Sequence, residues 1–235
     1  MRAAAIDALP APWPSDVDGW PRDTALLIID MQRDFCEEGG YISSMGYSVD
    51  EVRPIIKRIA AVRSWLAQLG AQIIFTREGH RTDLADLHWL KAERSRRGGA
   101  EIGSAGPLGR FLVRGELGWD IIPELAPNAE DVVIDKSGYS AFHATDLEQV
   151  ARSRGVRRLI LCGVTTDVCV HSTLRAAIDM GFECLVLEDC CAATLPSHHI
   201  AAIGTITTEG GIFGSVGTSS SVLALVQESR PATED

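Results

Sequence analysis

The chain has 235 residues, of which 46% are hydrophobic and 23% charged, a composition typical of a soluble globular enzyme with a substantial buried core. Its formal net charge of -10 argues against a nucleic-acid partner and against binding to anionic lipid, because both require basic patches. The longest apolar runs, such as TALLII, are too short to span a bilayer, so no membrane segment is expected.

The N-terminal stretch MRAAAIDALPAPWPSD has one basic residue, several prolines and no long apolar segment. We therefore expect an extended arm over about residues 1–22 and no secretory signal. The six cysteines have no regular spacing, which does not suggest a disulfide framework. Free cysteines are typical of a reducing compartment, so we expect a cytoplasmic location.

Short apolar runs alternate with longer amphipathic segments along the rest of the chain, a pattern typical of βαβ units and a parallel sheet. The runs predict strands over residues 24–30, 71–76, 130–136, 157–164, 183–189 and 211–216. Helical spacing predicts helices over residues 49–70, about 146–154, about 196–208, and in the segment that holds Cys169. No repeat or linker divides the sequence, which predicts a single domain over residues 1–235.

The segment over about residues 77–118 is rich in Arg, Gly and charged residues and shows little periodicity. Loops of this length inside a compact domain are usually lids or binding loops. We therefore expect residues 77–118 to form an active-site loop.

Three reactive side chains follow strands of the predicted sheet. Asp30 ends the first strand, Lys136 ends the third, and Cys169 lies just beyond the fourth. Each alone has an ordinary structural explanation as a turn residue, a solvated charge or a small buried hydrophobe. Ligands bind at the carboxyl ends of the strands in open parallel sheets, so the joint placement favours a catalytic site.

Cys169 has the chemical setting expected of a nucleophile. A cysteine in the first turn of a helix lies at the positive end of the helix dipole, which lowers the thiol pKa, and a nearby lysine lowers it further. A carboxylate can then shuttle the proton, and the backbone N–H groups of GVTT can form an oxyanion hole. The other cysteines are expected to be packing residues: Cys36, Cys162, Cys184, Cys190 and Cys191.

Several motifs together resemble the isochorismatase-like cysteine hydrolase superfamily: LLIIDMQRDF, the DK after the third strand, and GVTTDVCV. TREGHRTDLADL, RGELGWDIIPEL and EGGIFGSV are also similar to segments of the biuret hydrolase group. The resemblance implies a three-layer α/β/α fold with a six-stranded parallel sheet, a homotetramer, and a catalytic triad of Asp30, Lys136 and Cys169. It further implies a cis peptide bond between Val164 and Thr165, with the N–H groups of Thr165 and Cys169 forming the oxyanion hole.

Two residues depart from the biuret hydrolase pattern, which has Gln at the position of Glu209 and Lys at the position of Tyr139. Both are expected to line the pocket, where Glu209 would accept substrate N–H groups and Tyr139 would suit a neutral planar molecule. The expected substrate is therefore a neutral ureide, triuret or biuret, cleaved through a thioester-like adduct with release of ammonia. The alternative is an N-carbamoyl acid such as ureidoacrylate or carbamoylsarcosine, which would favour Arg or Lys in the pocket and against which Glu209 counts.

Phe35, Arg77 and His80 are further candidate substrate contacts, although Phe35 can equally be a core aromatic. A metal centre needs three or more ligands, whereas Glu78 and His80 supply two and His88 lies too far along the chain. We therefore expect no metal and no other cofactor.

Two other classes of protein fit the sequence poorly. The first strand runs into Asp30-Met31-Gln32 and not into the glycine-rich turn of a nucleotide-binding Rossmann fold. Cys190 and Cys191 are adjacent and do not form the C-x-x-C motif of a thioredoxin-like protein.

Overall fold

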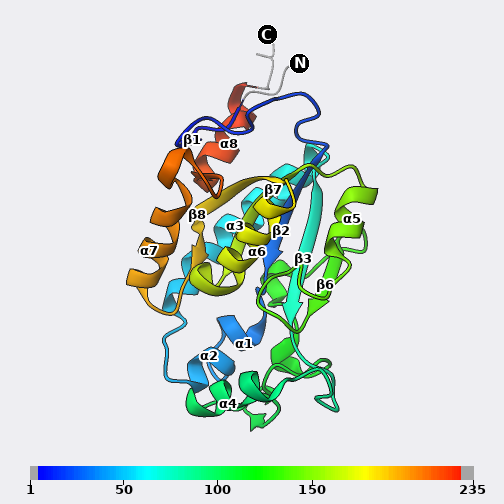
Figure 1. The fold of residues 1–235 in the computed structure, drawn as a ribbon, viewed down its shortest axis with the longest axis vertical. Coiled ribbons are helices and arrows are strands. Elements are labelled where there is room, and N and C mark those ends of the chain that lie inside the picture. The colour runs from blue at the N-terminus through cyan, green and yellow to red at the C-terminus, as the bar shows by residue number, and fades with distance from the viewer. Residues whose placement is uncertain (1–4, 229–235) are drawn as a thin grey trace, which may run out of the picture.

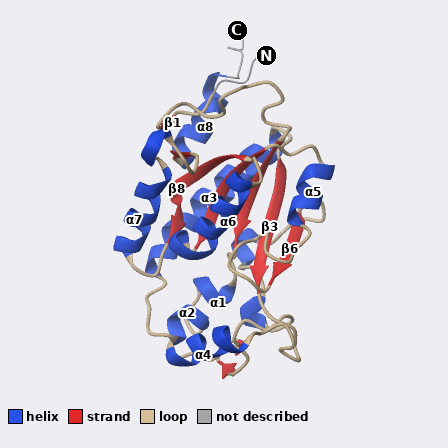
Figure 2. Cartoon of the chain, viewed as in Figure 1, coloured by secondary structure: helices blue, strands red, loops and turns tan. Residues whose placement is uncertain are grey.

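A seven-stranded sheet runs through the centre of the computed structural model, which describes residues 5–228 (Figure 2). The strand order is β1-β9-β8-β7-β2-β3-β6. The strands are β1 (Ala8–Leu9), β2 (Thr24–Ile29), β3 (Gln72–Glu78), β6 (Val132–Lys136), β7 (Arg158–Val164), β8 (Glu183–Ala192) and β9 (Ser215–Gly217). The ends of the predicted domain, residues 1–4 and 229–235, lie outside the described residues.

The sheet is mixed, which corrects the predicted sheet of six parallel strands. Strands β9, β8, β7, β2, β3 and β6 are parallel to their neighbours, whereas β1 pairs antiparallel with β9. β1 was missed because two residues from a proline-rich arm carry no strand periodicity. β2 and β7 lie in the middle of the sheet and are buried along their whole length, which is why their sequences are almost continuous apolar runs.

Helices cover both faces of the sheet (Figure 1). Right-handed crossovers place α3 on one face and α5, α6 and α7 on the other, because the chain moves outward in opposite directions from β2 and from β7. The helices are α3 (Arg53–Gln68), α5 (Leu147–Ser153), α6 (His171–Asp179), α7 (Pro196–Ile206) and α8 (Ser219–Glu228), which packs against α3. The chain order therefore reverses between β2 and β7, where ligands bind in folds of this class.

The segment between β3 and β6 is more ordered than the predicted loop. It contains α4 (Trp89–Arg97), the hairpin of β4 (Ala105–Gly106) and β5 (Gly109–Arg110), and the 3-10 turns η2 (Leu117–Trp119) and η3 (Pro123–Leu125). Figure 1 shows this segment beyond the carboxyl ends of the strands, together with α1 (Arg33–Cys36) and α2 (Tyr41–Ser44). The predicted loop over residues 77–118 is corrected accordingly: its first two residues end β3 and a nine-residue helix lies inside it.

The N-terminal arm is packed onto the body of the protein. Ile6 and Trp13 pair through their backbones, and Trp13 and Trp20 are both buried, with ring centroids 5.3 Å apart. The buried guanidinium of Arg158 donates to the Asp18 carbonyl at 3.1 Å, which ties the arm to the start of β7. No helix within residues 5–228 is long and apolar enough to cross a membrane.

Candidate active site

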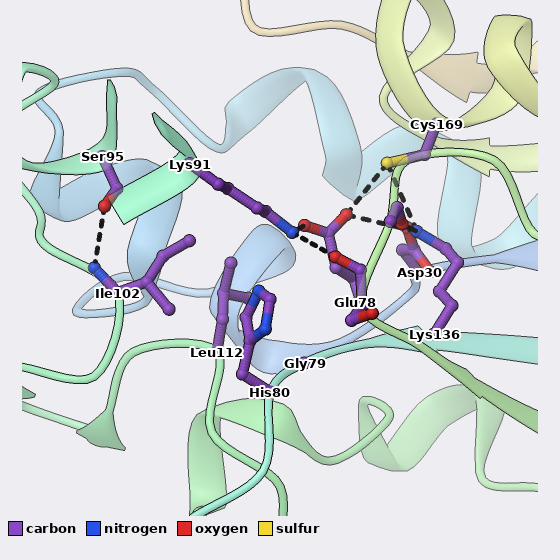
Figure 3. A network of polar contacts seen from close by, with 12 residues as sticks. Asp30, Glu78, Gly79, His80, Lys91, Ser95, Ile102, Leu112, Lys136 and Cys169 are labelled. Carbon is purple, nitrogen blue, oxygen red and sulfur yellow. Dashed lines mark hydrogen bonds and ion pairs between the residues drawn. The ribbon is translucent and has the colours of Figure 1, made fainter. Parts of the chain in front are cut away.

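The carboxyl ends of three strands bring the predicted catalytic side chains together (Figure 3). Asp30 directly follows β2, Lys136 is the last residue of β6, and Cys169 lies after β7 in a π-helical turn, η4 (Thr166–Val170). The turn leads straight into α6, so Cys169 stands at a helix start, as the sequence predicts. All three residues are buried.

The ammonium group of Lys136 lies at the centre of the site. Its Nζ is 2.7 Å from Asp30 Oδ2, 3.2 Å from Glu78 Oε2 and 3.6 Å from Cys169 Sγ. The carboxylate and sulfur atoms of these three partners lie within 4.8 Å of one another, a spacing that would also suit a cation. The Lys136 ammonium supplies positive charge beside these groups through its ion pairs with Asp30 and Glu78.

Glu78 is a second carboxylate of the site that sequence reasoning considered only as a possible metal ligand. It is the last residue of β3 and lies opposite Lys136 of β6 in the sheet register. Its Oε2 accepts a hydrogen bond from the Cys169 thiol at 3.2 Å, and its Oε1 accepts one from Lys91 Nζ at 2.6 Å. The signal that identified Asp30 and Lys136, a charge at the end of a buried strand, applies equally to Glu78.

The two carboxylates differ in their affinity for a proton. Burial raises the pKa of Asp30 even though the adjacent Lys136 ammonium opposes this shift. Burial also acts to raise the pKa of Glu78, but the ammonium groups of Lys136 and Lys91 outweigh it and lower that pKa to about 2. Glu78 is therefore ionised at neutral pH, whereas Asp30 holds a proton more readily.

The pKa of the Cys169 thiol is raised, opposite to the direction expected for a cysteine at a helix start beside a lysine. Complete burial raises the thiol pKa well above its usual value, and the carboxylates of Asp30 and Glu78 add to the effect of burial against the opposing charge of Lys136. Burial acts to lower the pKa of Lys136 itself, but the charge of Asp30 outweighs it, so the Lys136 pKa is raised. The Cys169 thiol and the Lys136 ammonium therefore both hold their protons more tightly than the free side chains do.

The backbone around Asp30 is fixed by its neighbours on β3 and β7. Asp30 has a φ of 52°, and its Oδ1 accepts a hydrogen bond from the Thr76 hydroxyl at 2.6 Å. Gly163 of β7 has a φ of 115°, and a Cβ atom there would collide with the carbonyl oxygen of Ile29. Glycine is therefore required where β7 passes beside the residue before Asp30.

A cavity of about 300 Å³ opens onto Cys169. One part of its wall comes from α1, α2 and the residues after them, and another comes from α4. The lining includes two of the predicted contacts, Phe35 and Tyr139, together with Thr165, Lys91 and Arg94. The bond between Val164 and Thr165 is cis, as the family resemblance implies.

Two of the predicted substrate contacts at the end of β3 are engaged elsewhere. Arg77 donates to Asp135 at 2.8 Å, and its guanidinium lies 3.7 Å from the centre of the Trp119 ring. His80 is buried with its Nδ1 3.2 Å from Asp86 Oδ1. Neither Arg77 nor His80 lines the cavity.

Glu209 also lies outside the cavity of its own chain. Thr194 lines the cavity, and α7 then carries the chain away over 11 residues, a rise of about 16 Å. Glu209 follows in the 3-10 turn η5 (Thr208–Gly210), where its φ is 52°. Sequence alone could not detect this, because the direction in which a helix leaves a site depends on its packing.

His88, the remaining metal candidate, caps a helix. Its Nδ1 accepts the backbone N–H of Lys91 at 3.2 Å at the start of α4. The five other cysteines are buried and none forms a disulfide within the described residues.

The fold and the site define a class of protein. A three-layer α/β fold with a buried cysteine, a lysine and two carboxylates at the point where the strand order reverses is the framework of a cysteine hydrolase. Residues 24–219 match the family described as the isochorismatase domain. The chain belongs to the isochorismatase family, as its motifs indicate.

The chain is also similar to individual proteins of known name and structure. The chain is 30% identical over 219 residues to the ureidoacrylate amidohydrolase RutB of Acinetobacter baylyi, covering 89% of this chain and 86% of that protein. A solved cysteine hydrolase from Pseudomonas syringae pv. phaseolicola is 26% identical, with a TM-score of 0.76 over 98% of this chain and 100% of that one. The N-carbamoylsarcosine amidase of Thermoplasma acidophilum shares the fold at 22% identity, with a TM-score of 0.63 over 83% of this chain and 96% of that one. These relatives carry names other than biuret or triuret hydrolase, so the finer placement in that group is not supported.

Proposed function

We propose that this protein hydrolyses a carbamoyl C–N bond of a small N-carbamoyl acid of the ureidoacrylate class, with Cys169 as the nucleophile. Two findings support this proposal. Relatives that align over most of the chain are named ureidoacrylate amidohydrolases. Arg94 also lines the catalytic cavity, and this is the observation that carries the proposal, because a guanidinium suits a substrate carboxylate.

That guanidinium belongs to Arg94 on α4. The Arg94 side chain lines the cavity and makes no hydrogen bond or ion pair with another residue in the range 5–228. By contrast, Lys91 on the same helix is neutralised by Glu78 at 2.6 Å. A guanidinium binds a carboxylate through two parallel hydrogen bonds, so Arg94 can anchor the acid group while the carbamoyl carbon meets Cys169.

The structure removes the main reason for preferring a neutral ureide. Glu209, which counted against an acidic substrate, does not line the cavity of its own chain. Biuret or triuret remains a second candidate because Tyr139 does line it, and the Lys91 ammonium lies 5.1 Å from the centre of the Tyr139 ring. A tyrosine face of this kind suits a planar neutral molecule.

The arrangement supports a two-step reaction. The Cys169 thiol gives its proton to Asp30 as its sulfur attacks the carbamoyl carbon, and the N–H groups of Thr165 and Cys169 stabilise the oxyanion. Asp30 gives a proton to the departing nitrogen, and a thioester-like adduct remains on the sulfur. Asp30 then takes a proton from the water that attacks this adduct and returns it to the sulfur as the C–S bond breaks, and Lys136 holds the Asp30 carboxylate in place at 2.7 Å. Ammonia is released as the leaving group or on breakdown of the carbamate, so it reports either course.

The test is an ammonia-release screen of ureidoacrylate, N-carbamoylsarcosine, biuret and triuret with the wild type and Arg94→Gln. We expect the wild type to prefer the acids. Loss of a charge-assisted hydrogen bond at a solvent-accessible site should raise KM for the acids about 10-fold, with little change in kcat or in the neutral substrates. Arg97→Gln is the matched control, because Arg97 lies on the same helix but is exposed, pairs with Glu93 and does not line the cavity.

Two outcomes would contradict the proposal. A clear preference for biuret or triuret, with acid KM values unaffected in Arg94→Gln, would favour the second candidate. Turnover close to wild type in Cys169→Ser would show that Cys169 is not the nucleophile, which would refute both candidate reactions. The homotetramer and the cytoplasmic location remain predictions.

A further inference from the structure

The buried charges around Cys169 form a balanced set that is larger than the triad of Asp30, Lys136 and Cys169. We infer that Glu78 is a positioning residue that shares the Lys136 ammonium with Asp30, and that Lys91 of α4 is the cation that balances Glu78. Through this ion pair the two residues set how readily Asp30 takes the thiol proton. The assignment rests on the proposed function, in which Cys169 is the nucleophile and Asp30 accepts its proton.

The Lys136 ammonium is divided between two carboxylates (Figure 3). Its Nζ lies 2.7 Å from Asp30 Oδ2 and 3.2 Å from Glu78 Oε2, and it donates to the Gly138 carbonyl at 3.0 Å. An ammonium group has three N–H donors, which these three oxygens can use, while the Cys169 sulfur lies farther away at 3.6 Å. Lys136 therefore compensates Asp30 only in part, because Glu78 competes for the same cation.

Both oxygens of Glu78 are engaged by lysines, which makes this carboxylate a fixed charge. Lys91 binds Oε1 at 2.6 Å, and Lys136 binds Oε2. Although burial acts to raise the Glu78 pKa, the charges of Lys136 and Lys91 lower it to about 2, so Glu78 stays ionised at neutral pH. Glu78 therefore acts through its charge, and the thiol proton goes to Asp30.

Lys91 supplies the positive charge that keeps the cluster neutral. Its side chain is buried, and it also donates to the Ser137 carbonyl at 2.6 Å, which fixes it beside the end of β6. With Asp30 and Glu78 ionised, the two carboxylates and the two ammonium groups sum to zero. A buried charge without a partner is costly, so removing one member of the set changes the proton affinity of the groups that remain.

The other titratable and charged groups around the cluster leave this balance unchanged. They come from several elements: Cys36 (α1), Tyr41 (α2), His80, Arg94 (α4) and Tyr139. Burial raises the pKa values of Cys36 and Tyr41 and lowers that of His80, so all three are uncharged at neutral pH. Arg94 and Tyr139 are the same in every variant below. Differences between the variants therefore report the Glu78 and Lys91 pair.

Alkylation of Cys169 by iodoacetamide tests the charge balance without a substrate. The reagent is neutral and reacts with the thiolate, so its rate at about pH 8 reports how easily the thiol loses its proton. Loss of one nearby charge moves a pKa by about 1–3 pH units, and about half of this change reaches the rate, because a less basic thiolate is a weaker nucleophile. Glu78→Gln should therefore speed alkylation about 3- to 30-fold, and Lys91→Gln should slow it by a similar factor.

The decisive variant removes both members of the pair. Glu78→Gln with Lys91→Gln is neutral again when Asp30 is ionised, so its alkylation rate should return to within about 3-fold of wild type. A purely structural pair would instead shift both single variants in the same direction, because a loosened site exposes the thiol, and would shift the double variant further.

Three controls accompany the comparison. Lys91→Arg keeps the charge and should resemble the wild type. Glu148→Gln removes an exposed carboxylate of α5 and should leave the rate unchanged. The rate in Cys169→Ser gives the background from the other cysteines, and mass spectrometry of the peptides confirms which cysteine is modified.

The pH dependence of ammonia release should follow the same signs. Asp30 must be ionised to accept the thiol proton, so kcat/KM falls as the pH drops through the Asp30 pKa. Burial raises this pKa, and the charge of Glu78 adds to the effect of burial while Lys136 opposes it. Glu78→Gln should therefore move the acid limb to lower pH and Lys91→Gln to higher pH, and the double variant should restore it.

The assignment is overturned if the two single variants shift alkylation in the same direction, or if the double variant lies no closer to wild type than the single variants do. Where one single variant does not fold, the comparison of the other with the double variant decides by the same criterion. A wild type that shows the expected pattern but releases no ammonia from any of the four compounds would contradict the proposed function and leave the charge balance intact.

Discussion

Asp34 is a buried acid that ties the segment over the active site to the body of the protein. Its Oδ2 accepts the backbone N–H of Leu112 at 2.9 Å, and its Oδ1 accepts that of Tyr41 at 3.2 Å. One carboxyl group therefore joins α1, α2 and the turn after β5. Burial raises the Asp34 pKa to about 6, although these two hydrogen bonds oppose the shift.

This raised pKa predicts a measurable dependence of stability on pH. The unfolded chain releases the Asp34 proton near pH 3.8 and the folded chain near pH 6, so the folded state holds an extra proton between these values. The contribution to the free energy of unfolding is therefore full below pH 3.8 and is lost as the pH rises through 6, by about 3 kcal/mol. Urea unfolding of the wild type and Asp34→Asn at about pH 4 and about pH 7 measures it. A wild-type advantage over Asp34→Asn that stays constant or grows with pH would refute the prediction.

At the scale of single elements, α4 decides the shape of the cavity although its sequence gives little sign of a helix. Its two buried residues, Lys91 and Ser95, are polar and four positions apart. Lys91 reaches Glu78, and the Ser95 hydroxyl accepts the backbone N–H of Ile102 at 3.0 Å, which fixes the chain beyond the helix. α4 is thus held to the core by polar contacts and not by an apolar stripe.

Ser95→Ala should loosen this element. The substitution leaves the buried N–H of Ile102 without its acceptor, which costs about 1–3 kcal/mol of unfolding free energy. Urea unfolding measures the loss, and faster hydrogen exchange at the Ile102 amide locates it. Ser153→Ala is the matched control, because the Ser95 and Ser153 hydroxyls each donate to the carbonyl three residues earlier, at 2.8 Å and 2.9 Å, but Ser153 is exposed. Equal effects of the two substitutions would show that the Ile102 contact does not matter.

The parts of the site that the sequence predicts are those carried by apolar strands, and the part that it misses is carried by the polar helix α4. Strands such as TALLII are buried on both faces, so an apolar run reveals them and the charge that follows each one. That logic found Asp30 and Lys136 and applied equally to Glu78, which was missed because the predicted strand ended at residue 76 and not at Glu78. No periodicity could reveal α4 or Arg94, and no local pattern reports that α7 carries Glu209 away from the site.

At the scale of the whole molecule, the N-terminal arm is part of the folded core. Trp13 is 1% exposed and packs edge-on against Trp20, and β1 extends the sheet beside β9. The arm precedes the family match, which begins at residue 24, and it covers apolar surface at the β9 edge of the sheet.

Truncating the buried tryptophan should destabilise the whole protein. We expect Trp13→Ala to lower the free energy of unfolding by about 3–5 kcal/mol, the usual cost of removing a large buried aromatic side chain. Trp89→Ala is the matched control, because Trp89 is 77% exposed and its loss should change stability by no more than about 0.5 kcal/mol. Chemical denaturation of both variants provides the comparison. A small effect of Trp13→Ala would mean that the arm is dispensable for folding.

The register between β3 and β6 has a consequence for how the sheet assembles. Arg77 faces Asp135 and Glu78 faces Lys136 across these two strands, so the order of charges on one strand is the reverse of that on the other. A slip of one residue would set Arg77 against Lys136 in one direction, or Glu78 against Asp135 in the other. Both mispairings place like charges side by side, which destabilises a strand pair. Glu78 and Lys136, which lie beside Cys169 in the site, thereby also help to fix the alignment of these two strands, and a chain that paired wrongly would separate the groups of the active site as well.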